Sequence, residues 1–254
     1  MLVCDTHIHS YRSFVGDGNM TLLNIAERSA ELGIDVAAVT DHLMKNEDVE
    51  DLVITRNEIL DFRSQGHKTS ILFGVEVCET AADGSILLDK KLCEDMCFEV
   101  VIGGVHETHM PHGASLGDMA VMQHRHHIMM MENPLVEILV HPWWLDKSEF
   151  ERLSIEWPED MSFIPEELTV ELANASRRTN TYIEISTMSG LCNKDTSPKF
   201  KQDLLEYYRL LNREGALFAV GTDTHELSEM TTFSSASDLI KAINISESRM
   251  WQPK

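Results

Sequence analysis

The sequence has few basic residues and no long apolar run. Lysine and arginine number 21 against 42 acidic residues, which gives a formal net charge of −21. Such a surface repels phosphate backbones and anionic membranes, which argues against a protein dedicated to long nucleic acids. No apolar run approaches the length of a membrane span, and the amino terminus lacks the basic-then-apolar pattern of a signal peptide. We therefore expect a cytoplasmic protein with no membrane and no long nucleic acid as partner.

Cysteine is also scarce and odd in number. The five cysteines lie mostly within apolar segments: Cys4, Cys78, Cys93, Cys97 and Cys192. Reduced, buried thiols in a cytoplasmic protein explain this pattern best. The pair Cys93-x-x-x-Cys97 could form half of a zinc site, but the chain offers no second pair to complete it.

The size and patterning of the chain indicate an α/β fold. Its 254 residues are 43% hydrophobic and contain no linker-like stretch, so residues 1–254 are expected to form a single catalytic domain. Strand-like apolar runs are predicted at 2–8, 35–40, 70–78, 98–105, 136–140, 182–186 and 216–220. Segments of helical period are predicted at 21–32, 47–64, 117–132, 165–179, 198–213 and 235–244. Alternation of strands and helices predicts a parallel sheet with helical crossovers, closed or nearly closed into a barrel. A hairpin with its turn at 82–85 is expected to extend the third strand.

The first strand ends in two histidines, His7 and His9. Residues two apart on a strand point to the same face, so these imidazoles would lie side by side at the carboxyl end of the strand. Two nitrogen ligands can be offered to one divalent metal in this way. His-x-His also arises by chance, so the motif needs support from the rest of the chain.

Side chains that can bind metals also lie at the carboxyl ends of nearly all the remaining predicted strands. In parallel α/β folds, functional sites form at the carboxyl ends of the strands. The side chains at these ends, together with one in the first loop, are Asp17, Asp41, His42, Glu76, His106, His141, Asp223 and His225. Any one histidine could belong to the core, but agreement among so many strand ends predicts a metal centre.

Other histidines and aromatic residues give weaker signals. We expect His124, His126 and His127 to lie on a solvated helical face, because residues i and i+2 diverge on a helix. Trp143 and Trp144 could wall a substrate pocket, with core or interface packing as an equal alternative. Loops 107–118, 143–165 and 187–197 are expected to shape that pocket.

Taken together, these motifs resemble those of the polymerase and histidinol phosphatase (PHP) family of metal-dependent phosphoesterases. The matching pieces follow the family's order over almost the whole chain: Asp5-Thr6-His7-Ile8-His9-Ser10, Gly16-Asp17-Gly18, Thr40-Asp41-His42, Gly74-Val75-Glu76, His106, His141-Pro142 and Gly221-Thr222-Asp223-Thr224-His225. The segment Ile183-Glu184-Ile185-Ser186 also resembles a family strand, which more usually carries asparagine at the position of Ser186.

The resemblance implies a distorted seven-stranded (β/α) barrel, TIM-like, with its metal site at the carboxyl ends of the strands. It implies two to three divalent ions, commonly zinc, manganese or iron. The ligands implied for a first ion are His7, His9, Glu76 and Asp223. Glu76 would bridge to a second ion, which His106 and His141 would complete. A third ion would be held by Asp17, His42 and His225.

The predicted activity is hydrolysis of small phosphate esters by direct attack of a metal-bound hydroxide, with no side-chain nucleophile. Asp41 is a candidate catalytic residue as the partner of a ligand imidazole, and strand-end capping is an equal alternative. Arg12, in the first loop, is a candidate to grip one phosphate, although a solvent-exposed arginine is equally consistent with its position.

Three other functions are alternatives to hydrolysis of small phosphate esters. A nuclease or phosphodiesterase acting on short oligonucleotides or nucleotides is the main alternative. An amidohydrolase barrel also opens with His-x-His, but it usually carries a bridging lysine on a middle strand, where this chain offers Glu76. A non-catalytic metal module of a polymerase assembly is least favoured, because every ligand position is filled.

Overall fold

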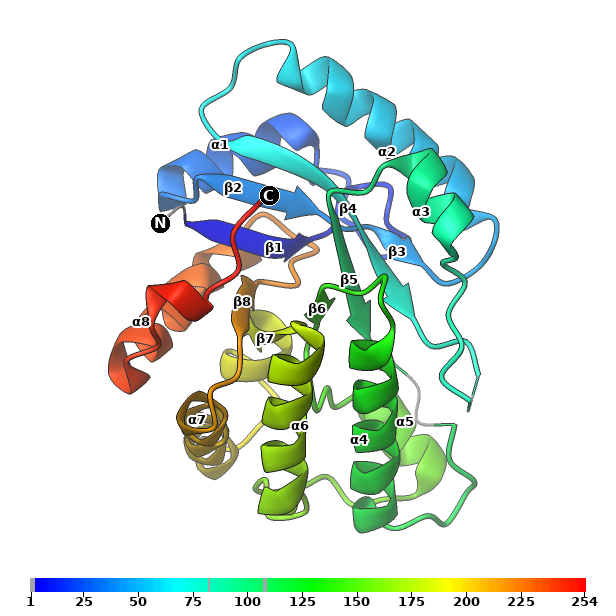
Figure 1. Ribbon diagram of the computed structural model, residues 1–254, viewed down its shortest axis with the longest axis vertical. Coiled ribbons are helices and arrows are strands. Elements are labelled where there is room, and N and C mark those ends of the chain that lie inside the picture. The colour runs from blue at the N-terminus through cyan, green and yellow to red at the C-terminus, as the bar shows by residue number, and fades with distance from the viewer. Residues whose placement is uncertain (1–2, 82, 107–108) are drawn as a thin grey trace.

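The computed structural model describes residues 3–81, 83–106 and 109–254. Its strands form a nearly closed barrel (Figure 1). Seven strands follow one another in the order β1-β2-β4-β5-β6-β7-β8, and the short β3 pairs with β4. The strands are β1 (Cys4–Ile8), β2 (Val36–Val39), β3 (His42–Leu43), β4 (Ser70–Cys78), β5 (Val100–Gly104), β6 (Ile138–Leu139), β7 (Tyr182–Ser186) and β8 (Phe218–Gly221). All neighbouring strands in this order are parallel, as the alternating pattern of the sequence predicts.

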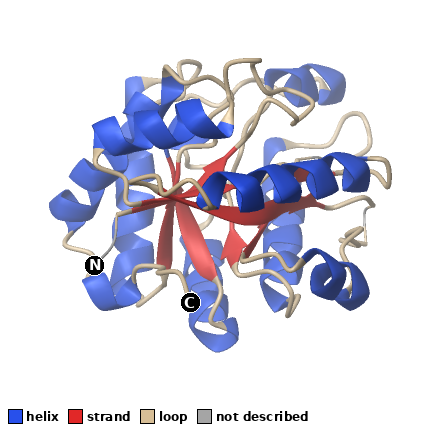
Figure 2. Ribbon diagram, turned by 90° about the horizontal axis from the view of Figure 1, so that it is seen from above, coloured by secondary structure: helices blue, strands red, loops and turns tan. Residues whose placement is uncertain are grey.

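Helices surround the strands on the outside of the barrel, as the view from above shows (Figure 2). They are α1 (Leu22–Leu32), α2 (Asp48–Arg63), α3 (Lys90–Met96), α4 (Leu116–Glu132), α5 (Lys147–Leu153), α6 (Glu166–Thr179), α7 (Pro198–Arg213) and α8 (Phe233–Ile243). A π-helical turn, Thr187–Leu191, follows β7, and short 3-10 turns occupy Glu229–Thr232 and Glu247–Arg249. Among the described residues, no helix has both the length and the apolar character needed to cross a bilayer.

The predicted strands and the six predicted helices are confirmed, whereas α3, α5 and β3 are additional. The first helix illustrates why the longer elements are predictable. Thr21 caps its amino end by accepting a hydrogen bond from the Asn24 N–H, and Gly33 ends it with a φ of 74°. The expected hairpin after the third strand is also present as an antiparallel bridge between Glu79 and Ile86, although Ala82 in its turn lies outside the described residues.

The barrel interior is apolar at its amino-terminal end and polar at the other. At the apolar end, residues from most of the strands form a buried cluster with one residue of the carboxyl-terminal segment. Its members are Cys4, Val36, Ala38, Leu72, Val100, Ile102, Ile138, Val140, Ala219 and Trp251. The Trp251 N–H donates to the carbonyl of Phe218, which fixes this segment beneath β8. A second, larger core lies between the strands and the helices. Buried polar side chains are therefore concentrated at the carboxyl ends of the strands.

The ends of the barrel sheet meet between β1 and β8. Asp5 is fully buried, and its carboxylate accepts hydrogen bonds from the N–H and the hydroxyl of Thr222 at 3.0 and 2.7 Å. Burial raises the pKa of Asp5 to about 7, although the hydrogen bonds from Thr222 oppose that rise. Closer to the carboxyl ends of the strands, a parallel bridge joins Ile8 and Thr224. These contacts bring the end of β1 beside the segment that follows β8.

The expectation of a solvated face for His124, His126 and His127 is wrong, because α4 packs against both α6 and the barrel strands. His127 is 1% exposed, and its ring meets Trp143 edge-on with centroids 5.0 Å apart. Burial lowers the pKa of His127 well below its ordinary value, so this side chain packs as a neutral aromatic ring. None of the five cysteines, all of which lie among the described residues, forms a disulfide. The expectation of burial holds for Cys4 and Cys78, whereas Cys93 and Cys192 are half-buried and Cys97 is exposed.

Candidate metal centre

The carboxylate of Glu76, on β4, lies at the centre of a group of histidines at the carboxyl ends of the strands. Its Oε2 lies 3.0 Å from Nε2 of His42 and 3.3 Å from Nε2 of His7. Its Oε1 lies 2.9 Å from Nε2 of His141 and 3.4 Å from Nε2 of His106. The two carboxylate oxygens thus face two different sets of imidazoles.

Glu76 is charged despite complete burial. Loss of solvent opposes the charge, but the neighbouring His42, His7 and His106 lower its pKa well below the ordinary value. A buried carboxylate needs cationic or hydrogen-bonding partners, because the uncompensated charge would be very costly. A carboxylate of lowered pKa with one oxygen toward each set of donors is suited to bridging two cations.

His7 and His9 lie side by side, as the i, i+2 spacing predicts. Their Nε2 atoms are 3.0 Å apart, and Oδ1 of Asp223 lies 3.4 Å from the first and 3.5 Å from the second. The Asp223 N–H donates to the carbonyl of His7 at 2.8 Å. Asp223 has a φ of 56° and His141 a φ of 31°, a backbone region that non-glycine residues rarely occupy and that is enriched at functional sites. The backbone at Asp223 and His141 is therefore held in uncommon conformations that direct both side chains toward the centre.

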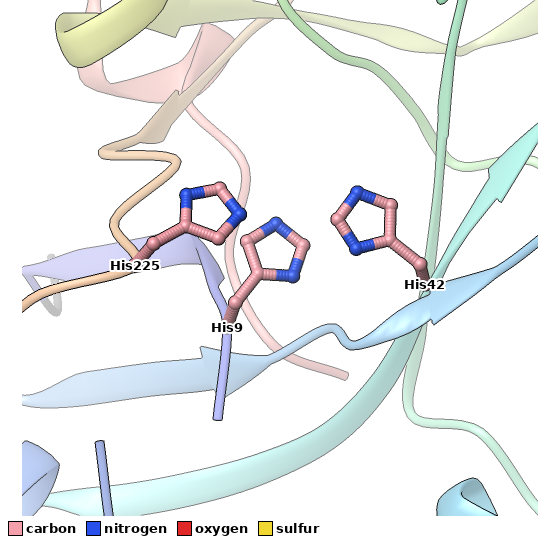
Figure 3. A group of neighbouring side chains, drawn as sticks. All are labelled: His9, His42 and His225. Carbon is pink, nitrogen blue, oxygen red and sulfur yellow. The ribbon is translucent and has the colours of Figure 1, made fainter. Parts of the chain in front are cut away.

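A third set of donors consists of His9, His42 and His225. Figure 3 shows the ring of His9 between the other two, and its centroid lies 4.3 Å from each of theirs. The rings of His9 and His42 are nearly parallel, at 11°. Burial lowers the pKa of His9 to about 4 and that of His42 to about 3. Both rings are therefore neutral near pH 7, the form in which imidazole binds metals.

The donor sets fit divalent ions. Within the described ranges, three groups have all their ligand atoms within 4.8 Å of one another: His7, His9 and Glu76; His42, Glu76 and His106; and His9, His42 and His225. Nε2 of His225 is buried without a hydrogen-bond partner. A buried nitrogen without a partner, beside the neutral imidazoles of His9 and His42, is a donor arrangement that zinc-like ions satisfy.

Glu184, on β7, contacts two predicted ligands, although the sequence analysis assigns it no role within the family-like segment 183–186. Its Oε1 lies 2.9 Å from Nδ1 of His7, and its Oε2 accepts the backbone N–H of His141 at 2.8 Å. Gly221 leaves room for it, because a Cβ there would fall 1.8 Å from Oε1. Glu184 therefore orients two predicted ligands from opposite sets. The signals in the sequence are a carboxylate within an apolar strand and the resemblance of segment 183–186 to a family strand.

Glu184→Gln is expected to weaken metal affinity and lower kcat/KM by about 10- to 100-fold, the usual cost of losing a carboxylate that orients a ligand histidine. The amide keeps the size of the side chain but cannot stabilise a proton on Nδ1 of His7 as a carboxylate does. Metal titration and steady-state kinetics measure both effects. Glu171→Gln, which changes the partner of His124 outside the centre, is the matched control. Wild-type metal affinity in Glu184→Gln would contradict this role.

Asp41 is buried and anchors the loop that follows β1. Its carboxylate accepts hydrogen bonds from the N–H and the hydroxyl of Ser10, both at 2.7 Å, and from the hydroxyl of Thr55 at 3.2 Å. Within the same loop, Oγ of Ser13 lies 3.0 Å from Nδ1 of His42. Ser13 thus contacts a predicted ligand imidazole directly. The carboxylate of Asp41 holds this loop in place, and the Asp41 carbonyl accepts the backbone N–H of Glu76 at 3.1 Å. The catalytic role of Asp41 stays a prediction.

Arg12 is already engaged within the chain. Its guanidinium lies 2.6 Å from Oε1 of Glu58, and its Cζ lies 4.8 Å from the ring centroid of Tyr11. Contact with a phosphate would require the guanidinium to leave or share Glu58. The predicted grip on a phosphate therefore stays untested.

Asp17 lies beside the centre, but its carboxylate is not brought together with the predicted partners. Its N–H donates to the carbonyl of His225 at 3.0 Å. Its exposed side chain accepts the N–H of Asn19 at 2.8 Å, and none of the three donor groups among the described residues contains it. In the set with His42 and His225, His9 occupies the place predicted for Asp17.

Comparison with known proteins gives two informative likenesses, and no family model matches the chain. A probable phosphatase of Clostridium novyi (strain NT) is 22% identical over 244 residues, which cover 96% of this chain and 87% of that protein. The crystal structure of the "putative histidinol phosphatase" of Listeria monocytogenes superimposes with a TM-score of 0.66 at 12% identity. The superposition covers 92% of this chain and 99% of that one.

The structural likeness shows a shared fold, and the relative covers nearly the whole chain. Both agree with the motifs, which occur in the family's order from β1 to the end of β8. The resemblance predicted from the sequence is confirmed: the chain is similar to the PHP family of metal-dependent phosphoesterases in its motifs and in its barrel fold.

Proposed function

We propose that this chain is a metal-dependent phosphoesterase that hydrolyses small phosphate esters, with residues 1–254 forming one PHP-type catalytic domain. The observation that carries the proposal is the fully buried carboxylate of Glu76, whose two oxygens face different sets of histidines. This arrangement favours a bridge between two cations. Similarity to two proteins described as phosphatases supports phosphate esters as the substrate class.

Two to three divalent ions of the zinc, manganese or iron type are proposed. The residues that would hold them are His7, His9 and Asp223 for the first, Glu76 as the bridge, and His106 and His141 for the second. His42 and His225 would hold the third, which Asp17 would complete only if its exposed side chain turned toward them. Ions at these positions would supply an activated water and the positive charge that offsets a phosphoryl group.

The chain's own residues orient this chemistry. Glu184 holds the ring of His7 and the backbone of His141, and Ser13 holds the ring of His42. Burial of these groups excludes bulk water, which strengthens every electrostatic contact with a phosphoryl group. No side-chain nucleophile is required. Histidines held rigidly by Glu184 and Ser13 favour direct attack by water on phosphorus.

Metal affinity is expected to fall as the pH is lowered from about 8 to 6, because protons compete for ligand nitrogens. Burial opposes the charge of His7 and His141, yet carboxylates raise the pKa of both: Glu184 and Glu76 act on His7, and Glu76 acts on His141. Since these two pKa values lie above the ordinary value of about 6.5, competition begins above that pH. His106, with a pKa near 3 because of burial, adds nothing in this window. Zinc titrations in buffers of different ionisation enthalpy should show proton release; affinity that does not vary with pH would contradict the expectation.

The substrate class is tested by specificity constants. At a net charge of −21, the protein has few cations with which to follow a nucleic-acid backbone, and binding of long strands gains little from counterion release. We expect kcat/KM to be higher for a panel of phosphomonoesters than for a dinucleotide or a long oligonucleotide. A clear preference for the oligonucleotide would reject the proposal in favour of the nuclease alternative.

A further inference from the structure

A cavity of about 170 Å³ lies between β1, β8, α8 and the carboxyl-terminal segment that follows α8. Phe218, at the start of β8, pairs with Ile183 of β7 on one edge and with Met250 of the carboxyl-terminal segment on the other. Met250 therefore takes the edge of β8 that faces β1, where the barrel would otherwise close. Among the described residues that line the cavity, none is a predicted metal ligand.

Most of the residues in the cavity wall are apolar. They include Val220 of β8, Phe233 and Ile240 of α8, and Trp251. Cys4 also lines the cavity, and burial raises the pKa of its thiol to about 12, so this group is uncharged near pH 7. Since an apolar cavity of about 150 Å³ stays dry and binds benzene, this volume is enough for an apolar body of about six carbons.

Two polar side chains of α8 lie along one edge of the cavity. Ser237 and Lys241 both line it, and they share a face of the helix because they are four residues apart. Over the ranges 3–81, 83–106 and 109–254, neither the hydroxyl of Ser237 nor the ammonium of Lys241 has a hydrogen bond or an ion pair. Together they offer one positive charge and a hydroxyl donor to a ligand in an otherwise apolar cavity.

We propose that this cavity is a second ligand site, separate from the metal centre, for a small monocarboxylate with an apolar body of about six carbons. The carboxylate accepts hydrogen bonds from Lys241 and Ser237, because an ionised carboxylate is only an acceptor. The apolar body packs against Val220, Phe233 and Trp251, which removes its surface from water. One ammonium balances one negative charge, and the net charge of −21 disfavours ligands of higher negative charge.

Calorimetry with hexanoate, acetate, hexan-1-ol and hexylamine tests this inference on the metal-loaded protein. We expect hexanoate to bind at least about tenfold more tightly than acetate, because its longer chain buries further CH₂ groups. Hexanoate should also bind more tightly than hexan-1-ol, and hexylamine should not bind. Lys241→Gln should lower the affinity for hexanoate about tenfold, the scale of a hydrogen bond to a charged group, and leave that for hexan-1-ol unchanged. Lys201→Gln, on α7 and outside the lining, is the matched control.

Carboxylates also have affinity for metal ions, so inorganic phosphate is used to separate the two sites. Phosphate in excess should occupy the metal centre and leave the affinity for hexanoate unchanged. Ser237→Leu should fill part of the cavity and abolish the binding of both hexanoate and hexan-1-ol. Circular dichroism and the hydrolysis of phosphomonoesters should be unchanged in this variant, because Ser237 does not belong to the centre.

Absence of hexanoate binding, equal affinity of wild type and Lys241→Gln for hexanoate, or displacement of hexanoate by phosphate would overturn the inference. Tighter binding of hexan-1-ol than of hexanoate would overturn the carboxylate as the head group. The proposed function fails on a different result, the absence of ester hydrolysis by metal-loaded protein. Binding of hexanoate with the expected response to Lys241→Gln would support the second site in either case.

Discussion

Glu76→Gln is expected to lower kcat/KM for phosphate esters by roughly a thousandfold or more, the scale seen when a main electrostatic element of an active site is removed. The substitution keeps the size of the side chain but removes its charge. The amide also presents an N–H₂ group to one of the two sets of histidines, where only an acceptor fits. Because both oxygens of Glu76 face predicted ligands, we expect the metals on both sides to be lost together.

Kinetics and elemental analysis of the same preparation separate this outcome from simple unfolding. Glu137→Gln is the matched control, because Glu137 lies at the other end of the barrel, where its carboxylate accepts a hydrogen bond from the indole of Trp251. Circular dichroism should show the same fold in both variants. Retention of full metal content and wild-type turnover by Glu76→Gln would mean that Glu76 is not a bridge.

Removal of bound metal is expected to abolish hydrolysis and to lower Tm by about 10 °C. Ligand present at a thousandfold excess over its Kd stabilises a protein by about 4 kcal/mol, and each kcal/mol moves Tm by about 2–4 °C at this size. The metal-free centre would retain some order, because His7 pairs with Glu184 and His141 with Glu76. Inactivation should therefore be reversible.

Thermal melts and assays in chelator, followed by addition of zinc, manganese or iron, measure this effect. Recovery of activity identifies which ions the centre accepts. Magnesium at the same concentration is a useful control, since its preference for oxygen ligands fits a histidine-rich centre poorly. Undiminished activity in chelator would contradict metal dependence.

The parts of the centre that could be predicted are those set by local geometry. His7 and His9 share a face because strand residues alternate, and this holds in any fold that contains the strand. His42, His106 and His141 could be predicted as neighbours because parallel strands end at the same side of a barrel. The strand and helix boundaries follow from apolar periodicity and from caps such as Thr21 and Gly33.

The parts that could not be predicted depend on contacts between distant segments. Glu184 reaches His7 across 177 positions in sequence, and Asp5 reaches Thr222 across 217. Neither pair leaves a local pattern. The buried histidines of α4 were missed because a helix packed on more than one side need not be amphipathic, and a neutral imidazole packs as an aromatic ring. The side-chain position of Asp17 is set by a hydrogen bond within its own turn, to the N–H of Asn19, which the motif does not reveal.

Glu76 is proposed to bridge cations in a cluster of ions rather than to serve a single site. The most direct measurement is the number of transition-metal ions per chain in purified, active protein, determined by elemental analysis together with the rate of phosphate release from a phosphomonoester. We expect two to three ions per chain and a rate that falls as ions are lost, since one ion of the zinc type usually takes about four ligands and the centre offers more. One ion or fewer per chain in fully active protein would contradict it.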